Sequence, residues 1–348
     1  AYTTIDNPEL FFQTKLYTGN SGTQSITFDG SENMQPDWVW QKRRDSSGNH
    51  ELTDSVRGIN KTLKSNLSSA EDTGTDKLQS FDSDGFTAGS SGTNNASGGS
   101  FVAWNWKASG STSSDSNGSI TSTVSANTTT GFSIVTYTGT GSNATVGHGL
   151  GAVPQVIIVK NRDGGSDNWA VYHEELGANN WLKLNTTDAS ATDTVMWNNT
   201  TPTSSVFSVG TYTNSNGNTN GMLAYCLTEK QGYSKFSSFV GNGSSDGAFV
   251  HTGFRPAFVM TKRTNSTSHW LMMDNKRNTF NVADTLLVAN DSDYESNWGT
   301  GRKIDFLSNG FKARSTSTGL NVSGSSYIYL AFAESPFVNS SGVPNNAR

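Results

Sequence analysis

Cysteine is nearly absent from this sequence: its 348 residues include one, Cys226. A single cysteine excludes an intrachain disulfide framework, so the fold must be stabilised by packing or by assembly. Cys226 lies in an apolar segment, where we expect a buried and unreactive thiol. A nucleophilic thiol would need a histidine partner, and we cannot place one in the sequence.

Charged residues are scarce as well, at 15% of the chain, and the formal net charge is −5. The longest basic cluster, Lys42-Arg43-Arg44, is too short for the basic surface that nucleic acid requires. No apolar run approaches the roughly 18 residues that a membrane-spanning helix needs. Because Ser, Thr, Asn and Gly are abundant, we expect a polar, mostly uncharged surface, with neither nucleic acid nor membrane as a partner.

Helical periodicity is also almost absent, apart from one candidate near the N-terminus. Asn7 is placed to cap a short helix, Pro8 fits its first position and Glu9 suits the helix dipole. A helix this short does not stay folded alone, so we expect a docking element. The remaining sequence alternates short apolar segments with Gly, Asn, Asp and Ser turns, which predicts an all-β fold.

One pattern occurs three times: a proline, an apolar run, and a lysine six positions after the proline, at residues 36–42, 154–160 and 256–262. Further anchors recur in the same order around each copy. They are Tyr17-Thr18-Gly19, Tyr137-Thr138-Gly139 and Phe239-Val240-Gly241; Leu63 with Asn66, Leu182 with Asn185 and Leu287 with Asn290; and Val102-Ala103-Trp104, Leu223-Ala224-Tyr225 and Leu330-Ala331-Phe332. The sequence therefore predicts three related units of roughly 90 to 100 residues, a usual domain size.

The anchors divide the chain into parts. We expect an N-terminal docking segment at 1–16, unit one at 17–108, a linker at 109–131, unit two at 132–232, unit three at 233–336 and a C-terminal tail at 337–348. Continuous apolar runs are typical of strands covered on both faces, so each unit should be a β-sandwich of the jelly-roll or lectin-like kind. The linker, rich in Ser, Thr and Gly, should be flexible, so unit one should move more freely than units two and three, which should pack rigidly together.

Two short motifs favour hairpin turns over ligand sites. Asp-Gly or Asn-Gly between aromatic residues predicts hairpins at 81–86 and 306–311. Asp82 and Asp84 could offer oxygen ligands to calcium, but the further carboxylates of a calcium loop are missing. Gly139-Thr140-Gly141 should be a turn and not a phosphate loop, because no helix follows it.

The remaining candidates for chemistry also have structural interpretations. His173-Glu174-Glu175 begins like a zinc-protease motif, but Gly177 stands where the second histidine belongs, so we expect neither metal nor cofactor. Asp54 with Arg57, and Asp274 with Arg277, recur at one distance from their prolines and should pair locally; unit two has Tyr172 in place of the aspartate. Catalysis on glycans would need two carboxylates converging in a cleft, which the sequence does not support, so we expect no enzyme.

Tryptophan is abundant, with nine residues, and it occurs among many Asn and Asp residues. Sugar sites use this pairing, with a ring face against the pyranose and amides for its hydroxyl groups. The alternative is that the rings fill sandwich cores, which the recurrence of aromatic residues at 104, 225 and 332 favours for Trp104. The candidate glycan-binding residues are Trp169, Trp181, Trp270, Asn185 and Asn290.

Segments distributed from about residue 10 to residue 340 carry a resemblance to a known family. They include residues 12–20, Asp54-Ser55-Val56-Arg57-Gly58, residues 81–86, Val102-Ala103-Trp104-Asn105-Trp106-Lys107, Gly147-His148-Gly149-Leu150-Gly151, Trp169-Ala170-Val171-Tyr172-His173, residues 253–259 and Ala331-Phe332-Ala333-Glu334-Ser335-Pro336-Phe337. In these segments the chain resembles repeat-built virion proteins of tailed bacteriophages, particularly those of marine bacteria, which are described as tail-fibre-like or appendage proteins.

The resemblance implies a structural part of a virion. We expect a homo-oligomer, a trimer, that docks on other virion proteins through its N-terminal segment and binds host-surface glycan weakly, gaining avidity from repeated copies. The chain lacks the extended shaft or coiled coil of long fibres, so a compact adaptor, knob or head decoration with no receptor role stays an alternative. A glycan depolymerase is a further alternative, which would demand paired carboxylates in a groove.

Overall fold

The computed structural model describes residues 2–297 and 302–344, so part of the expected C-terminal tail lies outside the described residues. The chain is nearly all β, with 42% strand and 4% helix, and several antiparallel sheets form sandwiches. This confirms the predicted all-β sandwich fold. None of the helices within the described ranges is long and apolar enough to cross a membrane.

The same order of four main strands occurs in all three units: first, last, second, third. In unit one the strands are β1 (Phe12–Thr18), β9 (Ser100–Trp106), β3 (Trp38–Arg43) and β4 (Glu51–Asp54). In unit two they are β12 (Phe132–Thr138), β19 (Gly221–Leu227), β14 (Val156–Asn161) and β15 (Ala170–His173). In unit three they are β20 (Ser234–Val240), β28 (Ser326–Pro336), β22 (Phe254–Arg263) and β23 (Trp270–Asp274).

Short strands extend or cover these main sheets. The outer extensions are β5 (Lys61–Thr62) with β6 (Asp72–Thr73) beside unit one, β16 (Asn180–Lys183) and β17 (Ala191–Thr192) in unit two, and β24 (Thr285–Val288) and β25 (Ser296–Asn297) in unit three. The covering sheets are β2 (Gln24–Ile26), β8 (Gly85–Ala88) and β7 (Leu78–Asp82); β13 (Ala144–Gly147) and β18 (Val206–Val209); and β21 (Phe249–His251), β27 (Gly310–Ala313) and β26 (Ile304–Leu307). The predicted hairpins are confirmed as β7–β8 and β26–β27.

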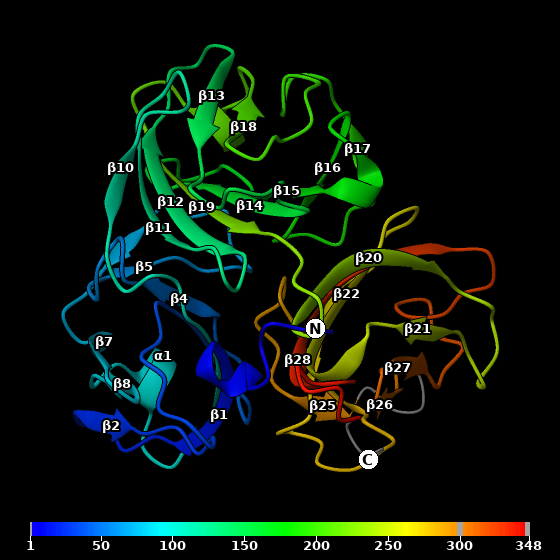
Figure 1. The fold of residues 1–348 in the computed structure, drawn as a ribbon. Coiled ribbons are helices and arrows are strands. Elements are labelled where there is room, and N and C mark those ends of the chain that lie inside the picture. The colour runs from blue at the N-terminus through cyan, green and yellow to red at the C-terminus, as the bar shows by residue number, and fades with distance from the viewer. Residues whose placement is uncertain (1, 298–301, 345–348) are drawn as a thin grey trace.

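Each main sheet is apolar on both faces, which explains the continuous apolar runs. In β14, Val156 and Ile158 point to a core shared by all three units, whereas Ile157 and Val159 point to the outer core of unit two. Unit one and unit three have outer cores of their own. Figure 1 shows the three units around one centre, with unit two at the top, unit one at the lower left and unit three at the lower right.

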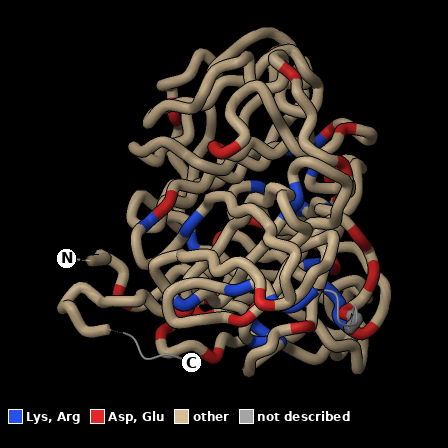
Figure 2. The backbone as a smooth tube through the Cα atoms, turned by 90° about the vertical axis from the view of Figure 1, so that its right-hand side faces the viewer, with Lys and Arg blue, Asp and Glu red and all other residues tan. Residues whose placement is uncertain are grey.

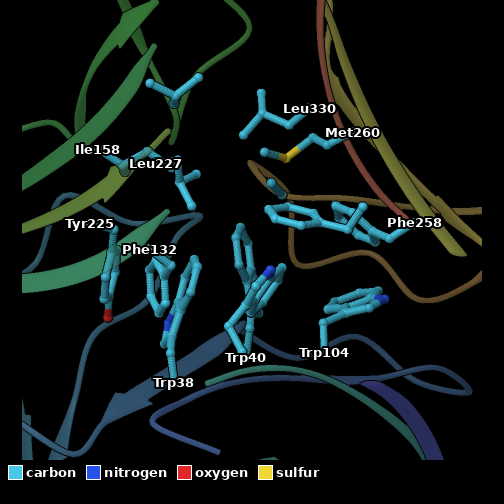
Figure 3. Close-up of a cluster of buried hydrophobic side chains, with 14 of the residues drawn as sticks. Trp38, Trp40, Trp104, Phe132, Ile158, Tyr225, Leu227, Phe258, Met260 and Leu330 are labelled. Atoms are coloured by element: carbon cyan, nitrogen blue, oxygen red, sulfur yellow. The ribbon is translucent and has the colours of Figure 1, made fainter. Parts of the chain in front are cut away.

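Aromatic rings from the three units meet in the shared core (Figure 3). Trp38 of unit one stacks on Tyr225 of unit two at 4.1 Å between ring centroids, and Trp104 meets Phe258 of unit three edge-on at 5.8 Å. The expectation that unit one moves freely is therefore wrong. Its sheet buries large rings against both neighbours, and moving it would expose them to water.

The predicted flexible linker is also corrected. Residues 109–131 contain two strands, β10 (Ser113–Asp115) and β11 (Ser122–Asn127), which extend the unit two sheet beyond β12. Every residue of β11 pairs with β10, with β12 or with both. Alternating Val124 and Ala126 provide the apolar side of this strand, a short signal within a Ser- and Thr-rich stretch.

The N-terminal segment docks on its own chain. The expected short helix is a single turn, η1 (Pro8–Leu10), capped by Asn7, whose side chain accepts from the backbone N–H of Glu9. Strand β1 begins at Phe12, inside the expected docking segment, and the Phe12 ring stacks on Phe332 of unit three at 5.3 Å. Thr3 donates its hydroxyl to the carbonyl of Gln231. The segment thus joins unit one to unit three and to the end of unit two.

Candidate functional site

The candidate tryptophans Trp169 and Trp270 lie at joints between units and are buried. The indole N–H of Trp169 donates to the carbonyl of Lys64 in unit one at 2.9 Å, and that of Trp270 donates to the carbonyl of Lys183 in unit two at the same distance. Trp169 directly precedes β15 and Trp270 begins β23, and each acceptor directly follows the repeated leucine of the preceding unit. One hydrogen bond therefore recurs at two joints.

His50 takes the same position at the third joint, between unit one and unit three. Its Nε2 lies 2.9 Å from the carbonyl of Val288, which follows the repeated leucine of unit three. Its Nδ1 accepts from the indole N–H of Trp40 at 2.8 Å. Because an indole N–H can only donate, Nδ1 must be the acceptor and Nε2 must carry the proton. Burial, with Lys42 nearby, lowers the pKa of His50 well below its usual value and favours this neutral form.

The candidate asparagines hold these same residues in place. Asn185 Oδ1 accepts from the backbone N–H of Trp169 at 3.0 Å, and Asn290 Oδ1 accepts from that of Trp270 at 2.8 Å. In unit one, Asn66 accepts from the backbone N–H of His50 at 3.1 Å. The Leu-to-Asn repeat is thus a structural device that fixes the loop before the third strand.

Trp181 lies apart from the joints, in the outer core of unit two. Its ring is 4% exposed and packs near Tyr212 and below the ammonium group of Lys183. The structure brings Trp169 together with Asn185 and Trp270 with Asn290, but it gathers neither pair with Trp181 around a hollow. A sugar platform requires an exposed ring face, and the three candidate tryptophans have none in this chain.

The repeated lysines cross the same joints. Lys42 Nζ donates to the carbonyl of Ser292, Lys160 Nζ to that of Ser68 and Lys262 Nζ to that of Thr187, each acceptor belonging to a neighbouring unit. Each Nζ donates to a second carbonyl in its own unit, and these acceptors are Arg43, Asp167 and Ser268. All three lysines are buried, and burial lowers the pKa of each to about 8. The sequence showed the lysine repeat but gave no sign of its partner in another unit.

The two predicted acid–arginine pairs are confirmed, and both are fully buried. Arg57 Nε lies 2.6 Å from Asp54 Oδ2, and the same carboxylate accepts from the hydroxyl of Tyr225 in unit two at 2.9 Å. Arg57 also pairs with Glu71, which binds Arg162 of unit two through two hydrogen bonds. The predicted local pair is therefore part of the joint between units one and two.

Unit three repeats this network against unit one. Arg277 Nε lies 2.6 Å from Asp274 Oδ2, which accepts from the indole N–H of Trp104 at 3.0 Å. The Arg277 guanidinium also lies over the Trp104 ring, 5.4 Å from its centroid. Glu295 N–H donates to the carbonyl of Arg44, as Glu71 N–H does to that of Arg162.

Unit two has no aspartate at the position of Asp54 and Asp274. The pairing of its strands shows that the residue there is not Tyr172, as we expected. His173, not Tyr172, stands opposite Val156, as Asp54 stands opposite Trp38 and Asp274 opposite Phe258. His173 lies 17 positions after its partner Val156, whereas Asp54 and Asp274 lie 16 positions after theirs, and this extra residue explains the wrong expectation. Burial lowers the pKa of His173 to about 4, and its Nδ1 accepts from the backbone N–H of Glu175 at the start of η2 (Glu174–Leu176). The zinc-like motif is thus a capped turn.

Three buried asparagines that sequence reasoning missed pin the remaining loops. Asn95 and Asn216 end the short helices α1 (Gly92–Asn95) and α2 (Thr213–Asn216), and Asn321 lies in the matching loop of unit three. Each side chain accepts from the backbone N–H of the residue that follows the glycine of the first repeated anchor, which is Gly19, Gly139 or Gly241. Each also donates to two or more oxygens, most of them backbone carbonyls. A Cβ on Gly139 would lie 2.1 Å from the Gly217 carbonyl oxygen, which explains that glycine. The only signal was an asparagine preceding each closing strand.

The other candidate ligands are already occupied within the chain. Asp82 accepts from Ser80 and Thr87, and Asp84 accepts from the backbone N–H of Met34. Burial raises the pKa of the Cys226 thiol, as expected for an unreactive cysteine. Within residues 2–297 and 302–344, no three His, Cys, Asp or Glu side chains cluster as a metal site would require.

Two hollows flank the added strand β10. One, of about 360 Å³, is lined by residues 109–117 with Val124, Ala126 and Gly149, and the other, of about 240 Å³, lies beside Thr121 and Arg162. At the centre of the shared core the remaining cavity is about 10 Å³ and lined by apolar and aromatic side chains. The polar groups that recur among the units lie at the joints and not in these hollows.

Comparison with known proteins identifies one family. A search of curated proteins finds no match to the chain. The family model described as a domain of unknown function, DUF7483, matches residues 7–336, which includes all three units and the joints between them. The chain therefore belongs to the DUF7483 family.

Proposed function

We propose that this chain is a non-enzymatic structural component of a bacteriophage particle, of the appendage type, that contributes to adsorption on the host surface. One observation carries the proposal: the repeated ionisable residues bind one another, or backbone groups, across the joints between units. Asp54, Arg57, Asp274 and Arg277 have fully buried side chains. Such groups hold a shape, whereas catalytic groups would face a substrate hollow.

Rigidity of this kind suits a particle component. Three sandwiches share one aromatic core, and each joint carries a ring N–H bond and a lysine bond to backbone carbonyls. Breaking one joint would expose apolar rings and leave buried polar groups unpaired, which is costly. The resemblance to phage appendage proteins agrees with a protein that must keep its shape outside a cell.

The burial of Trp169, Trp181 and Trp270 favours a second candidate, a capsid or tail decoration or adaptor with no receptor role. A host-binding function would need another part of the surface. Docking on other virion proteins would also need another surface, because the N-terminal segment is packed against unit three and against the end of unit two. A homotrimer stays part of the proposal, and analytical ultracentrifugation of the purified chain tests it.

Localisation and adsorption test the proposal together. Antibodies against the chain should label intact phage particles in electron micrographs, and the purified chain should reduce phage adsorption when it is added to host cells first. Label on the tail with adsorption blocking supports the attachment role. Label on capsid facets without blocking supports the decoration role. Particles that carry no label contradict both.

A further inference from the structure

The two strands β10 and β11 are an addition to the repeated unit. Between units two and three the chain passes from Leu227 at the end of β19 to Ser234 at the start of β20, with no extra strand. Between units one and two it adds β10 and β11 at the edge of the unit two sheet. The residues that recur in all three units serve the joints. Strands β10 and β11 have no counterpart between units two and three, so they are a place where a separate function can be built.

This addition forms one wall of the 360 Å³ hollow, called here the β10 hollow: residues 109–117 with Val124, Ala126 and Gly149. Hydroxyl and amide groups of residues 109–117 line its side, and Val124 and Ala126 supply aliphatic surface. Gly149 has φ of +69°, and its position would place a Cβ only 3.0 Å from the Ala126 side chain. A polar wall beside a small aliphatic floor suits a ligand with hydroxyl groups on its edge and C–H groups on its face.

Asp115 gives the β10 hollow a fixed acceptor. Its side chain is held against the backbone of Gly147, where a Cβ would lie 2.2 Å from Oδ1, and the residue is 7% exposed. Oδ1 accepts from the backbone N–H and the side-chain amide of Asn117, at 2.9 and 2.8 Å. Among the described residues Oδ2 accepts no hydrogen bond. A carboxylate oxygen at the lining of a hollow with no protein donor favours a ligand that brings a hydroxyl group.

Charge narrows the class of ligand. Residues 108–159 contain no Lys or Arg, and Asp115 is their sole carboxylate. In Figure 2 the uppermost part of the molecule carries a few isolated acidic residues and almost no Lys or Arg, and most charged residues lie lower down. A phosphate, sulfate or carboxylate group would meet Asp115 with no Lys or Arg among the residues that line the hollow to offset the repulsion. A neutral ligand avoids this repulsion.

We infer that the β10 hollow binds a neutral saccharide unit, with Asp115 Oδ2 accepting from a sugar hydroxyl and Val124 and Ala126 beneath the C–H face. The inference rests on the adsorption role proposed above and places it on the surface of unit two instead of on the buried tryptophans. Repeated copies of the chain on one particle would multiply a weak single-site affinity.

The test uses the purified full chain and a panel of neutral glucan, mannan and galactan oligosaccharides, with anionic alginate oligosaccharides for comparison. Calorimetry and NMR titration should find binding of a neutral member, with shifts confined to residues 109–117, Val124, Ala126 and Gly149. Asp115→Asn keeps an acceptor for Asn117 but removes the charge, and should weaken binding at least tenfold. Ser113→Tyr should abolish binding by filling the hollow. Thr121→Tyr adds the same ring beside the opposite hollow and should leave binding unchanged.

Thermal unfolding of each variant shows whether it still folds, and Thr121→Tyr controls for an added ring. No binding of any neutral oligosaccharide by the wild-type chain overturns the inference, as does preference for alginate or equal binding by Asp115→Asn and Ser113→Tyr. If the chain is found in the particle but binds no oligosaccharide, the saccharide site is contradicted and the virion role is not. If the chain binds an oligosaccharide through Asp115 but is missing from particles, the virion role is contradicted and the saccharide site is not.

Discussion

Arg277 shows how single residues secure the joints. Its side chain is fully buried, and it contacts the Asp274 carboxylate, the Met272 carbonyl and the face of Trp104 from unit one. A buried ion pair adds little net stability when it is compared with well-packed apolar residues. Removing one partner is a different matter, because it leaves the other charge buried without compensation.

Asp274→Ala should therefore lower the free energy of unfolding by about 3 to 5 kcal/mol, since it strands Arg277 and removes the acceptor of the Trp104 indole. Urea unfolding followed by tryptophan fluorescence measures the change. Asp246→Ala is the matched control: its side chain is 73% exposed and pairs with Lys312 and Arg314 at the surface, so its loss of stability should be far smaller. Equal losses in the two variants would mean that the buried network has no special role.

Individual roles were predictable where both partners lie close in sequence. Asp274 and Arg277 are three residues apart, so their pairing followed from spacing alone. The interpretation of Trp169 as a sugar platform failed because composition does not say which rings are buried. Its partner, the Lys64 carbonyl, lies 105 positions away, and sequence spacing carries no information about such a contact.

At the scale of elements, β10 and β11 show that a linker-like composition can form paired strands. Residues 109–131 have the Ser, Thr and Gly content of a linker, yet β11 pairs on both sides. Three apolar positions, Ile120, Val124 and Ala126, pack on the outer core of unit two and fix this segment. By contrast, the hairpins at β7–β8 and β26–β27 were predictable because turn chemistry is local.

The amides of β11 should exchange with solvent slowly, since they lie between β10 and β12 in the unit two sheet. Hydrogen exchange with mass spectrometry should find residues 122–127 nearly as protected as β12, with the exposed turn at residues 151–153 exchanging fast. Limited proteolysis should likewise leave units one and two joined. Rapid exchange across the whole of residues 109–131 would instead support the prediction that this segment is a flexible linker.

At the scale of the whole molecule, one ring of three units is closed by equivalent contacts. Lys42, Lys160 and Lys262 each donate to two carbonyls, and a neutral amine has the two N–H groups that this requires. Their pKa of about 8 lies below the value of about 10.4 expected in an unfolded chain. Between these values the unfolded chain binds more protons, so the free energy of unfolding should rise with pH.

Buried tyrosines determine the pH above which the free energy of unfolding stops rising. Burial raises the pKa of Tyr17, Tyr137, Tyr225 and Tyr233 above the usual value of 10.0, so above about pH 10 the folded chain retains protons that the unfolded chain loses. Stability should therefore fall again in that range. The balance predicts a maximum in mildly alkaline solution, between the two sets of titrations.

Urea midpoints measured from pH 7 to pH 11 should rise between about pH 8 and pH 10 and then decline. Each buried lysine contributes a slope of up to roughly 1.4 kcal/mol per pH unit, so Lys160→Met should reduce the rise by about a third. Lys183→Met is the control, because Lys183 lies partly exposed beside Asp188 and should leave the slope unchanged. A midpoint that is flat or falls from pH 8 to pH 10 would mean that the three lysines stay fully protonated in the folded chain. The joints would then hold ammonium groups and not neutral amines.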